Sequence, residues 1–148
     1  MTQVTFYTGV PERLMYLCRL LRKAQRSGSR VGVCGPDSLL RRLDAKLWDF
    51  EAAEFVPHLR VDGLADGSPE HKAKQLAATP ILLAEQAQSL PHRELLLNLG
   101  PEMPTGFEQF QRVLEVVSQD PEQMQAGRRR YKQYEALGYG VQHHKVSQ

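Results

Sequence analysis

Hydrophobic and polar positions in the first third of the chain follow the pattern of two strand–helix units. Residues 4–7 form a short apolar run typical of a strand, and residues 12–26 place leucines at helical spacing opposite arginines and lysines. A second, buried strand is predicted at 30–34, followed after a glycine–proline turn by another helix. The apolar face of that helix consists of Leu39, Leu40, Leu43 and Leu47. Two such units in series favour parallel strands joined by helical crossovers.

The middle of the chain alternates short apolar runs with irregular segments. Residues 55–58 are expected to be a short extended piece, because the residue before a proline avoids the helical conformation. The stretch 62–79 contains several glycines and prolines and is expected to be a variable surface excursion with a short helix. Further buried strands are predicted where apolar residues run together, at 81–83, 95–99 and 112–117.

The last predicted helix has a clear beginning and a clear end. Asp120 can cap it, Pro121 suits its first turn, and Gln123 occupies the reciprocal position of a capping box. Gly138 marks its end. The sequence therefore predicts a single α/β domain over residues 1–148, with a mainly parallel sheet flanked by helices.

Composition and charge place the chain among globular proteins. Of its 148 residues, 41% are hydrophobic and 24% charged, and the formal net charge of +2 is too small to imply nucleic-acid binding by itself. Arginine and lysine instead concentrate in two stretches, 13–30 and 128–132. Cys18 and Cys34 lie in apolar segments and are expected to be buried free thiols of a reducing compartment. With no visible signal peptide or membrane-spanning run, we expect a soluble, cytoplasmic protein.

The sequence carries no catalytic, metal or cofactor motif. The turns at 8–11 and 34–37 stand where nucleotide-binding folds hold phosphate, but neither matches a phosphate-binding loop, and their prolines remove N–H donors. The histidines have no ligand spacing with cysteine or carboxylate; they are His58, His71, His92, His143 and His144. The last two are expected to be solvated in a polar tail. No serine stands in a nucleophile elbow, so we expect a protein without catalytic residues.

One positive signal lies on the C-terminal helix. Arg128, Tyr131, Lys132 and Glu135 fall at i, i+3, i+4 and i+7, so they share one side of the helix. A tyrosine between two cations suits a peptide that ends in a hydrophobic residue and a carboxylate. In the alternative interpretation, Tyr131 and Tyr134 pack on the sheet and the cations are only solvated.

A second candidate surface surrounds Trp48. This residue lies roughly 80° beyond the apolar face of its helix, at about 100° per residue. It either folds onto the core of its own domain or forms an exposed apolar patch with Phe55, Val56 and Pro57. Patches of the latter kind usually contact a partner.

Taken together, these segments resemble the chi subunit of bacterial DNA polymerase III holoenzyme. The resemblance rests on residues 4–7, on Leu47-Trp48 followed by residues 54–58, and on residues 128–134 with Gly138 behind them. It spans nearly the whole chain and is weakest over 62–79.

The resemblance implies a non-catalytic accessory subunit of the clamp loader with a Rossmann-like fold and no cofactor. Members of the family bridge the psi subunit and the acidic, phenylalanine-terminated tail of single-stranded-DNA-binding protein during DNA replication. By the resemblance, the tail-binding residues are Arg128, Tyr131, Lys132 and Val117, and Arg130 is an additional cation that makes the surface more basic. The psi-binding residues are Trp48, Phe55, Val56, Pro57 and His58. Whether a helicase also uses the psi surface stays open.

Two rival functions belong to other classes. The arginine-rich helix could bind single-stranded DNA directly, which predicts affinity for bare DNA with a steep salt dependence. A nucleotide-dependent enzyme is suggested only by analogy of fold, and it predicts stabilisation by ATP.

Overall fold

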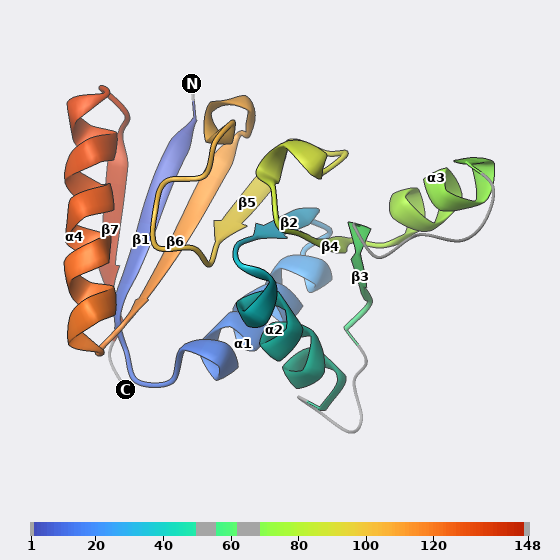
Figure 1. Cartoon of the computed structure of the whole chain (residues 1–148), viewed down its shortest axis with the longest axis horizontal. Helices are drawn as coiled ribbons and strands as arrows, with labels where there is room; N and C mark the ends of the chain where they lie inside the picture. The colour runs from blue at the N-terminus through green and yellow to red at the C-terminus, as the bar shows by residue number, and fades with distance from the viewer. Residues whose placement is uncertain (1, 50–55, 62–68, 147–148) are drawn as a thin grey trace.

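A single parallel sheet organises the chain, and helices pack on both of its faces (Figure 1). The computed structural model describes residues 2–49, 56–61 and 69–146. The sheet has seven strands in the order β3-β4-β2-β5-β6-β1-β7, and every pairing is parallel. The predicted α/β class is therefore confirmed, with a sheet that is parallel throughout. The elements are β1 (Gln3–Val10), α1 (Arg13–Arg26), β2 (Val31–Cys34), α2 (Asp37–Asp49), β3 (His58–Arg60), α3 (Pro69–Ala78), β4 (Ile81–Ala84), β5 (Leu95–Asn98), β6 (Arg112–Ser118), α4 (Pro121–Ala136) and β7 (Val141–Lys145), with short 3₁₀ turns at Ala87–Ser89 and Phe107–Gln109.

The central strands are apolar along their length because both faces of the sheet are covered. All four residues of β2 and of β4 are buried. Successive residues point to opposite faces, so Val31 and Val33 join the core under α1 and α2, whereas Cys34 joins the core under α4. Helices α1 and α2 pack beside each other on the first face (Figure 1). Helix α4 covers the other face at the β1–β7 end of the sheet (Figure 1).

Most predicted elements appear within a residue or two of their expected bounds. Helix α4 begins as the capping residues indicate, since the Asp120 carboxylate accepts a hydrogen bond from the Gln123 backbone N–H at 3.1 Å. Gly138 follows the helix with φ +88°, a conformation that favours glycine. Of the short extended piece predicted at 55–58, His58 begins β3, residues 56 and 57 precede the strand, and residue 55 lies outside the described residues. The predicted helix within 62–79 is α3, which buries none of its residues and projects from the body (Figure 1), whereas 62–68 lie outside the described residues.

The largest difference from the sequence prediction is at the C-terminal end. His143 and His144 were expected in a solvated polar tail; both are exposed, as expected, but they belong to a strand and not to a tail. Residues Val141–Lys145 form β7, which pairs in parallel with β1 and places His143 opposite Phe6. An edge strand with four exposed residues has no apolar alternation to reveal it.

Neither cysteine is in a disulfide, and both are buried, as predicted. Among the helices that the structure describes, none has the length and apolar character that a membrane span requires. Across residues 2–49, 56–61 and 69–146, no three His, Cys, Asp or Glu side chains are grouped as a metal site would need.

Candidate functional site

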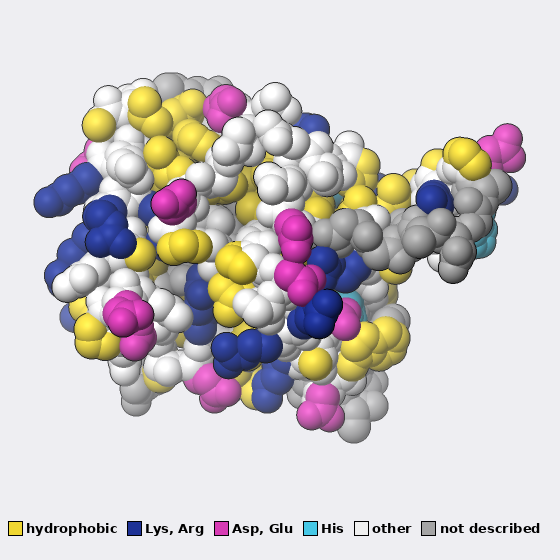
Figure 2. Space-filling model, viewed as in Figure 1, with side chains coloured by type: hydrophobic (Ala, Val, Ile, Leu, Met, Phe, Trp, Pro, Cys, Tyr) yellow, Lys and Arg dark blue, Asp and Glu magenta, His cyan; other side chains and the backbone are white. Residues whose placement is uncertain are grey.

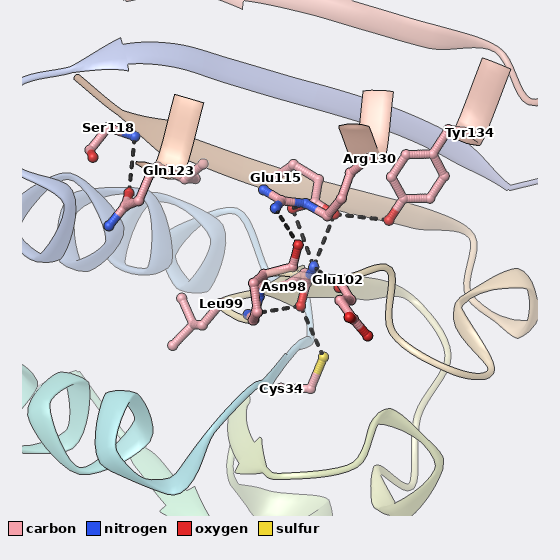
Figure 3. Close-up of polar contacts among 12 residues, drawn as sticks. Cys34, Asn98, Leu99, Glu102, Glu115, Ser118, Gln123, Arg130 and Tyr134 are labelled. Atoms are coloured by element: carbon pink, nitrogen blue, oxygen red, sulfur yellow. Dashed lines mark hydrogen bonds and ion pairs between the residues drawn. The ribbon is translucent and has the colours of Figure 1, made fainter. Parts of the chain in front are cut away.

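A buried carboxylate holds α4 against the sheet. Glu115 lies on β6 with no solvent exposure, and three side chains donate to it (Figure 3). Arg130 Nε donates to Oε1 at 3.0 Å, and the Tyr134 hydroxyl donates to Oε2 at 2.9 Å. From β5, Asn98 Nδ2 donates to Oε2 at 3.0 Å. Because Arg130 and Tyr134 are four residues apart, both face inward on α4, and their shared partner sets the rotation of the helix about its axis.

This network is buried in a region of low polarity, and that burial shifts the pKa values of its members. Burial raises the pKa of Glu115, and the charge of Arg130 and the bonds from Asn98 and Tyr134 act in the opposite direction. Burial, together with the neighbouring Glu115 charge, also raises the pKa of Tyr134. The same two causes raise the pKa of Cys34, whose Sγ lies 4.0 Å from Asn98 Oδ1, to about 12. The network therefore has a structural role: one buried carboxylate and its hydrogen-bond donors join α4 to the sheet.

We expect the two buried thiols to make stability fall at alkaline pH. Burial raises the pKa of Cys18 to about 11 and that of Cys34 to about 12, above the ordinary thiol value of 9.0. Above pH 9 the unfolded chain releases these protons while the folded protein holds them, so unfolding becomes more favourable as pH rises. The effect per thiol is on the order of 1 kcal/mol by pH 10. Urea unfolding from pH 7.5 to 10 tests this, and a Cys18→Ala plus Cys34→Ala variant should lose less stability over that range; an equal loss contradicts the prediction.

With Arg130 and Tyr134 turned inward, the next face of α4 borders a cavity of about 260 Å³ between this helix and strands β1, β6 and β7. We call it the α4–β7 cavity. The helix comes close to β6 there because residue 127 is glycine; a Cβ atom at this position would lie 2.8 Å from Val117 Cγ2. The hydrophobic part of the lining comprises Phe6, Val117, Met124 and Tyr131. The Tyr131 ring packs against the Phe6 ring with centroids 5.1 Å apart.

Basic side chains surround this apolar lining. Arg128 contributes from α4, and His143 and Lys145 contribute from β7. The lining contains no aspartate or glutamate, and in the described part of the chain neither Arg128 nor Lys145 forms an ion pair. Lysine and arginine side chains also gather over α4 on the face shown in Figure 2. The cavity thus combines a hydrophobic surface with unneutralised positive charge, which suits a ligand that is both apolar and anionic.

The structure brings together three of the four residues predicted to bind a peptide tail. Arg128, Tyr131 and Val117 all line the α4–β7 cavity, whereas Lys132 is exposed beside it and is not part of the lining. Arg130 does not make the surface more basic, because it is only 3% exposed and its charge is paired with Glu115. That part of the sequence interpretation is wrong.

Sequence reasoning missed the contribution of β7 to this cavity. Its residues His143 and Lys145 were not assigned to the binding site because no strand was predicted there. No local signal marks this strand, because polar residues occupy both of its faces.

The residues predicted to bind psi differ in how far they are exposed to solvent. Trp48, at the end of α2, is 63% exposed, so it does not fold onto the core. Its ring lies edge-on to the His58 ring, with centroids 5.3 Å apart. Val56 is buried in the core under α1 and α2, Pro57 is half-buried, and Phe55 lies outside the described residues. Trp48 is therefore the large apolar side chain that this surface presents to solvent within the described segments 2–49 and 56–61.

His58 is held behind Trp48 by polar groups. Its ring is buried, with Nδ1 at 2.8 Å from the Val56 carbonyl oxygen and Nε2 at 2.9 Å from Asp44 Oδ1. Nearby, Arg60 Nη1 donates to Asp37 Oδ1 at 3.0 Å, which ties β3 to the start of α2. These bonds orient the Trp48 surface, and they give His58 a supporting position rather than an exposed one.

Comparison with known proteins agrees with the resemblance drawn from the short segments. The family model described as "DNA polymerase III chi subunit, HolC" matches residues 1–142. The chain is 34% identical over 152 residues to DNA polymerase III subunit chi of Pseudomonas aeruginosa, covering 99% of this chain and 98% of the relative. The subunits of that name from Haemophilus influenzae and Escherichia coli are each 30% identical over 126 residues, covering 84% of this chain and 81% and 80% of the relatives. The chain belongs to the DNA polymerase III chi subunit family.

Proposed function

We propose that the protein is a non-catalytic subunit that joins the clamp loader to the protein coat on single-stranded DNA. In this proposal, the α4–β7 cavity binds the acidic C-terminal tail of single-stranded-DNA-binding protein, and the Trp48 surface binds the psi subunit. The observation that carries the proposal is the α4–β7 cavity itself. Its apolar lining is bordered by Arg128 and Lys145, and no aspartate or glutamate among the described residues belongs to that lining.

The chemistry of a phenylalanine-terminated tail matches this lining part by part. The terminal ring would pack on Phe6, Val117 and Tyr131, and burying a phenylalanine side chain contributes about 1.5–3 kcal/mol. The α-carboxylate of the same residue lies within a few ångströms of its ring, so it falls among the bordering cations. A charge-assisted hydrogen bond from Arg128 would contribute on the order of 1.5–3 kcal/mol when partly desolvated.

The proposed affinity is moderate and sensitive to salt. Arg128 is exposed, so its attraction to acidic tail residues is screened over about 10 Å at 0.1 M salt. A moderate affinity is sufficient in an assembly, because a subunit already bound through psi meets the tail at a raised effective concentration.

Isothermal titration calorimetry with a synthetic acidic peptide ending in phenylalanine tests the proposal. We expect Arg128→Ala to weaken binding about tenfold, because it removes the cation on the α4 side of the cavity. Arg129→Ala is the matched control: Arg129 is the next residue and is also exposed, but it does not line the α4–β7 cavity. Lys132→Ala should have an effect between those two. A peptide without its terminal phenylalanine should bind weakly to every variant.

Equal losses for Arg128→Ala and Arg129→Ala would mean that the helix attracts the peptide by charge alone. That result would contradict a defined pocket and would favour the rival function, direct binding of single-stranded DNA by the basic helix. Direct binding predicts affinity for bare oligonucleotides that falls steeply with salt, which fluorescence anisotropy measures. The burial of Arg130 against Glu115 leaves that rival with fewer surface cations than the sequence indicates.

A further inference from the structure

A second cavity borders α4, and the proposed function does not use it. It has a volume of about 460 Å³ and is lined from the starts of α1 and α2, from the loop after β5, from the end of β6 and from one side of α4. We call it the strand-end cavity. Among the described residues, only Val117 belongs both to this lining and to that of the α4–β7 cavity.

The two cavities lie on opposite sides of α4. The residues that α4 contributes to the strand-end cavity include Glu122, Ala126 and Arg129. Those that it contributes to the α4–β7 cavity include Met124, Arg128 and Tyr131. Each set has the spacing i, i+4 and i+7, and the two sets are offset by two residues, so they occupy different faces of the helix. The neighbouring arginines 128 and 129 therefore serve different cavities.

The order of the strands explains why the sheet leaves a cavity at this place. β1 and β6 are neighbours, yet α1 follows β1 onto one face of the sheet and α4 follows β6 onto the other. Connections that diverge in this way open a crevice at the carboxyl edge of a parallel sheet, where ligands of open α/β sheets bind. The loop that walls the crevice is fixed by Asn98, whose Oδ1 accepts from the Gly100 N–H at 3.0 Å and whose Nδ2 donates to the Glu102 carbonyl oxygen at 2.9 Å (Figure 3).

Arg13 lies in this cavity without a counter-charge. Its Nε donates to the Val116 carbonyl oxygen and its Nη2 to the Leu99 carbonyl oxygen, both at 3.1 Å, so one guanidinium joins β6 to the end of β5. In the described part of the chain Arg13 forms no ion pair, and its Nη1 has no acceptor. Burial lowers the pKa of Arg13, the charge of Arg130 acts in the same direction, and the charge of Glu115 opposes them. A largely buried cation of this kind is stabilised by an anion.

Two more guanidinium groups line the same cavity. Arg130 uses Nε and Nη1 on protein acceptors, and its Nη2 donates to none of the described residues. Arg129 is exposed and has no ion pair within residues 2–49, 56–61 and 69–146. The lining also contains two exposed carboxylates, Asp120, which caps α4, and Glu122 in its first turn. These carboxylates repel a weakly charged anion, so the site favours a ligand with several negative charges.

We propose that the strand-end cavity binds a small organic molecule that carries a di- or triphosphate, with Arg13 and Arg129 as its anion-binding residues. The planar guanidinium group donates in pairs and matches phosphate oxygens. The cavity falls within the usual range of small-molecule sites, about 300–1,000 Å³, and Leu39 and Leu99 offer apolar surface to the organic part. The turns at 8–11 and 34–37 lack a phosphate-binding loop, and arginine side chains at the same edge of the sheet take its place. This inference goes beyond the proposed function and does not depend on it.

Isothermal titration calorimetry of the full chain with ATP and with inorganic pyrophosphate, both in EDTA, tests the site. We expect both to bind, ATP more tightly because its nucleoside meets the apolar lining. Arg129→Ala should weaken ATP binding about tenfold. Arg128→Ala is the matched control, because Arg128 is the adjacent exposed arginine but lines the other cavity, and it should bind ATP like the wild type. With the acidic peptide the two variants should exchange roles.

Arg13→Lys tests the second anion-binding residue. Lysine keeps the charge but cannot hold two carbonyl oxygens and a phosphate together, so ATP binding should again weaken about tenfold. Thermal unfolding without ligand reports whether this variant is less stable, and the exposed Arg129 keeps the test independent of that result.

The proposal is overturned if neither ATP nor pyrophosphate binds, or if Arg128→Ala and Arg129→Ala weaken ATP binding equally. A single-stranded oligonucleotide is the third probe. If it binds and depends on Arg129 while ATP and pyrophosphate do not bind, the site takes the phosphates of nucleic acid and the small-molecule proposal is wrong. Because binding of the acidic peptide is measured separately, none of these results decides the proposed function.

Discussion

Replacing Glu115 with alanine is expected to lower the free energy of unfolding by about 3–5 kcal/mol. The substitution leaves the Arg130 guanidinium buried without its counter-charge, and the Tyr134 hydroxyl loses its acceptor. Urea denaturation followed by circular dichroism measures the loss. The same variant should also bind the acidic peptide poorly, because the rotation of α4 that directs Arg128 toward β7 depends on the two inward-facing residues.

A second variant at this position separates charge from shape, and a variant in the first turn of α4 serves as the control. Glu115→Gln keeps the acceptor oxygen and the volume but removes the charge, so its loss of stability should be intermediate. Glu122→Ala, which removes an exposed carboxylate from the first turn of α4, should change stability by about 0.5 kcal/mol or less. Wild-type stability in Glu115→Ala would show that hydrophobic packing of α4 alone holds the helix, and would refute the role assigned to the buried carboxylate.

Replacing Trp48 with alanine is expected to weaken binding of the psi subunit by about 2–4 kcal/mol, the range of an aromatic hot spot. Trp48 is 63% exposed and its indole stands edge-on to a histidine ring that is itself fixed by hydrogen bonds, so the side chain is presented in a defined orientation. Surface plasmon resonance with immobilised psi measures the change. Peptide binding at the α4–β7 cavity should be unaffected, because α4 and β7 contribute nothing to the Trp48 surface.

A suitable control is Leu137→Ala, since Leu137 is 57% exposed but lies at the end of α4. It should leave psi binding unchanged. Trp48→Phe should retain part of the affinity, because an aromatic ring remains in the same place. The assignment of this surface fails if Trp48→Ala binds psi with wild-type affinity, or if it loses psi and the acidic peptide together while remaining folded.

The elements with a strong local pattern were predictable from sequence. Helix α1 is specified by leucines that recur every three or four residues, and residues Leu17 and Leu21 are buried as that spacing requires. The start of α4 is specified by Asp120 and Gln123, whose hydrogen bond is present. Short apolar runs mark β2, β4 and β5, because strands covered on both faces leave no position for a polar residue to reach water.

Strand β7 and the far side of the cavity were not predictable in this way. β7 exists because α4 returns the chain alongside β1, and its pairing is made by backbone groups that every residue carries. Its side chains are mostly exposed, so their hydrophobicity has no reason to alternate. The roles of His143 and Lys145 depend on that pairing and were invisible for the same reason.

By itself, the sequence determined the family, the α/β class and the positions of the helices and buried strands, because these depend on local periodicity and on apolar burial. It presented three consecutive arginines, 128 to 130, without distinguishing them. Only the tertiary structure decided that Arg130 points inward to Glu115 while Arg128 borders the cavity. The physical reason is that a charge is stabilised by whichever partner the fold brings close, and for Arg130 that partner lies on a neighbouring strand, across the interface between helix and sheet.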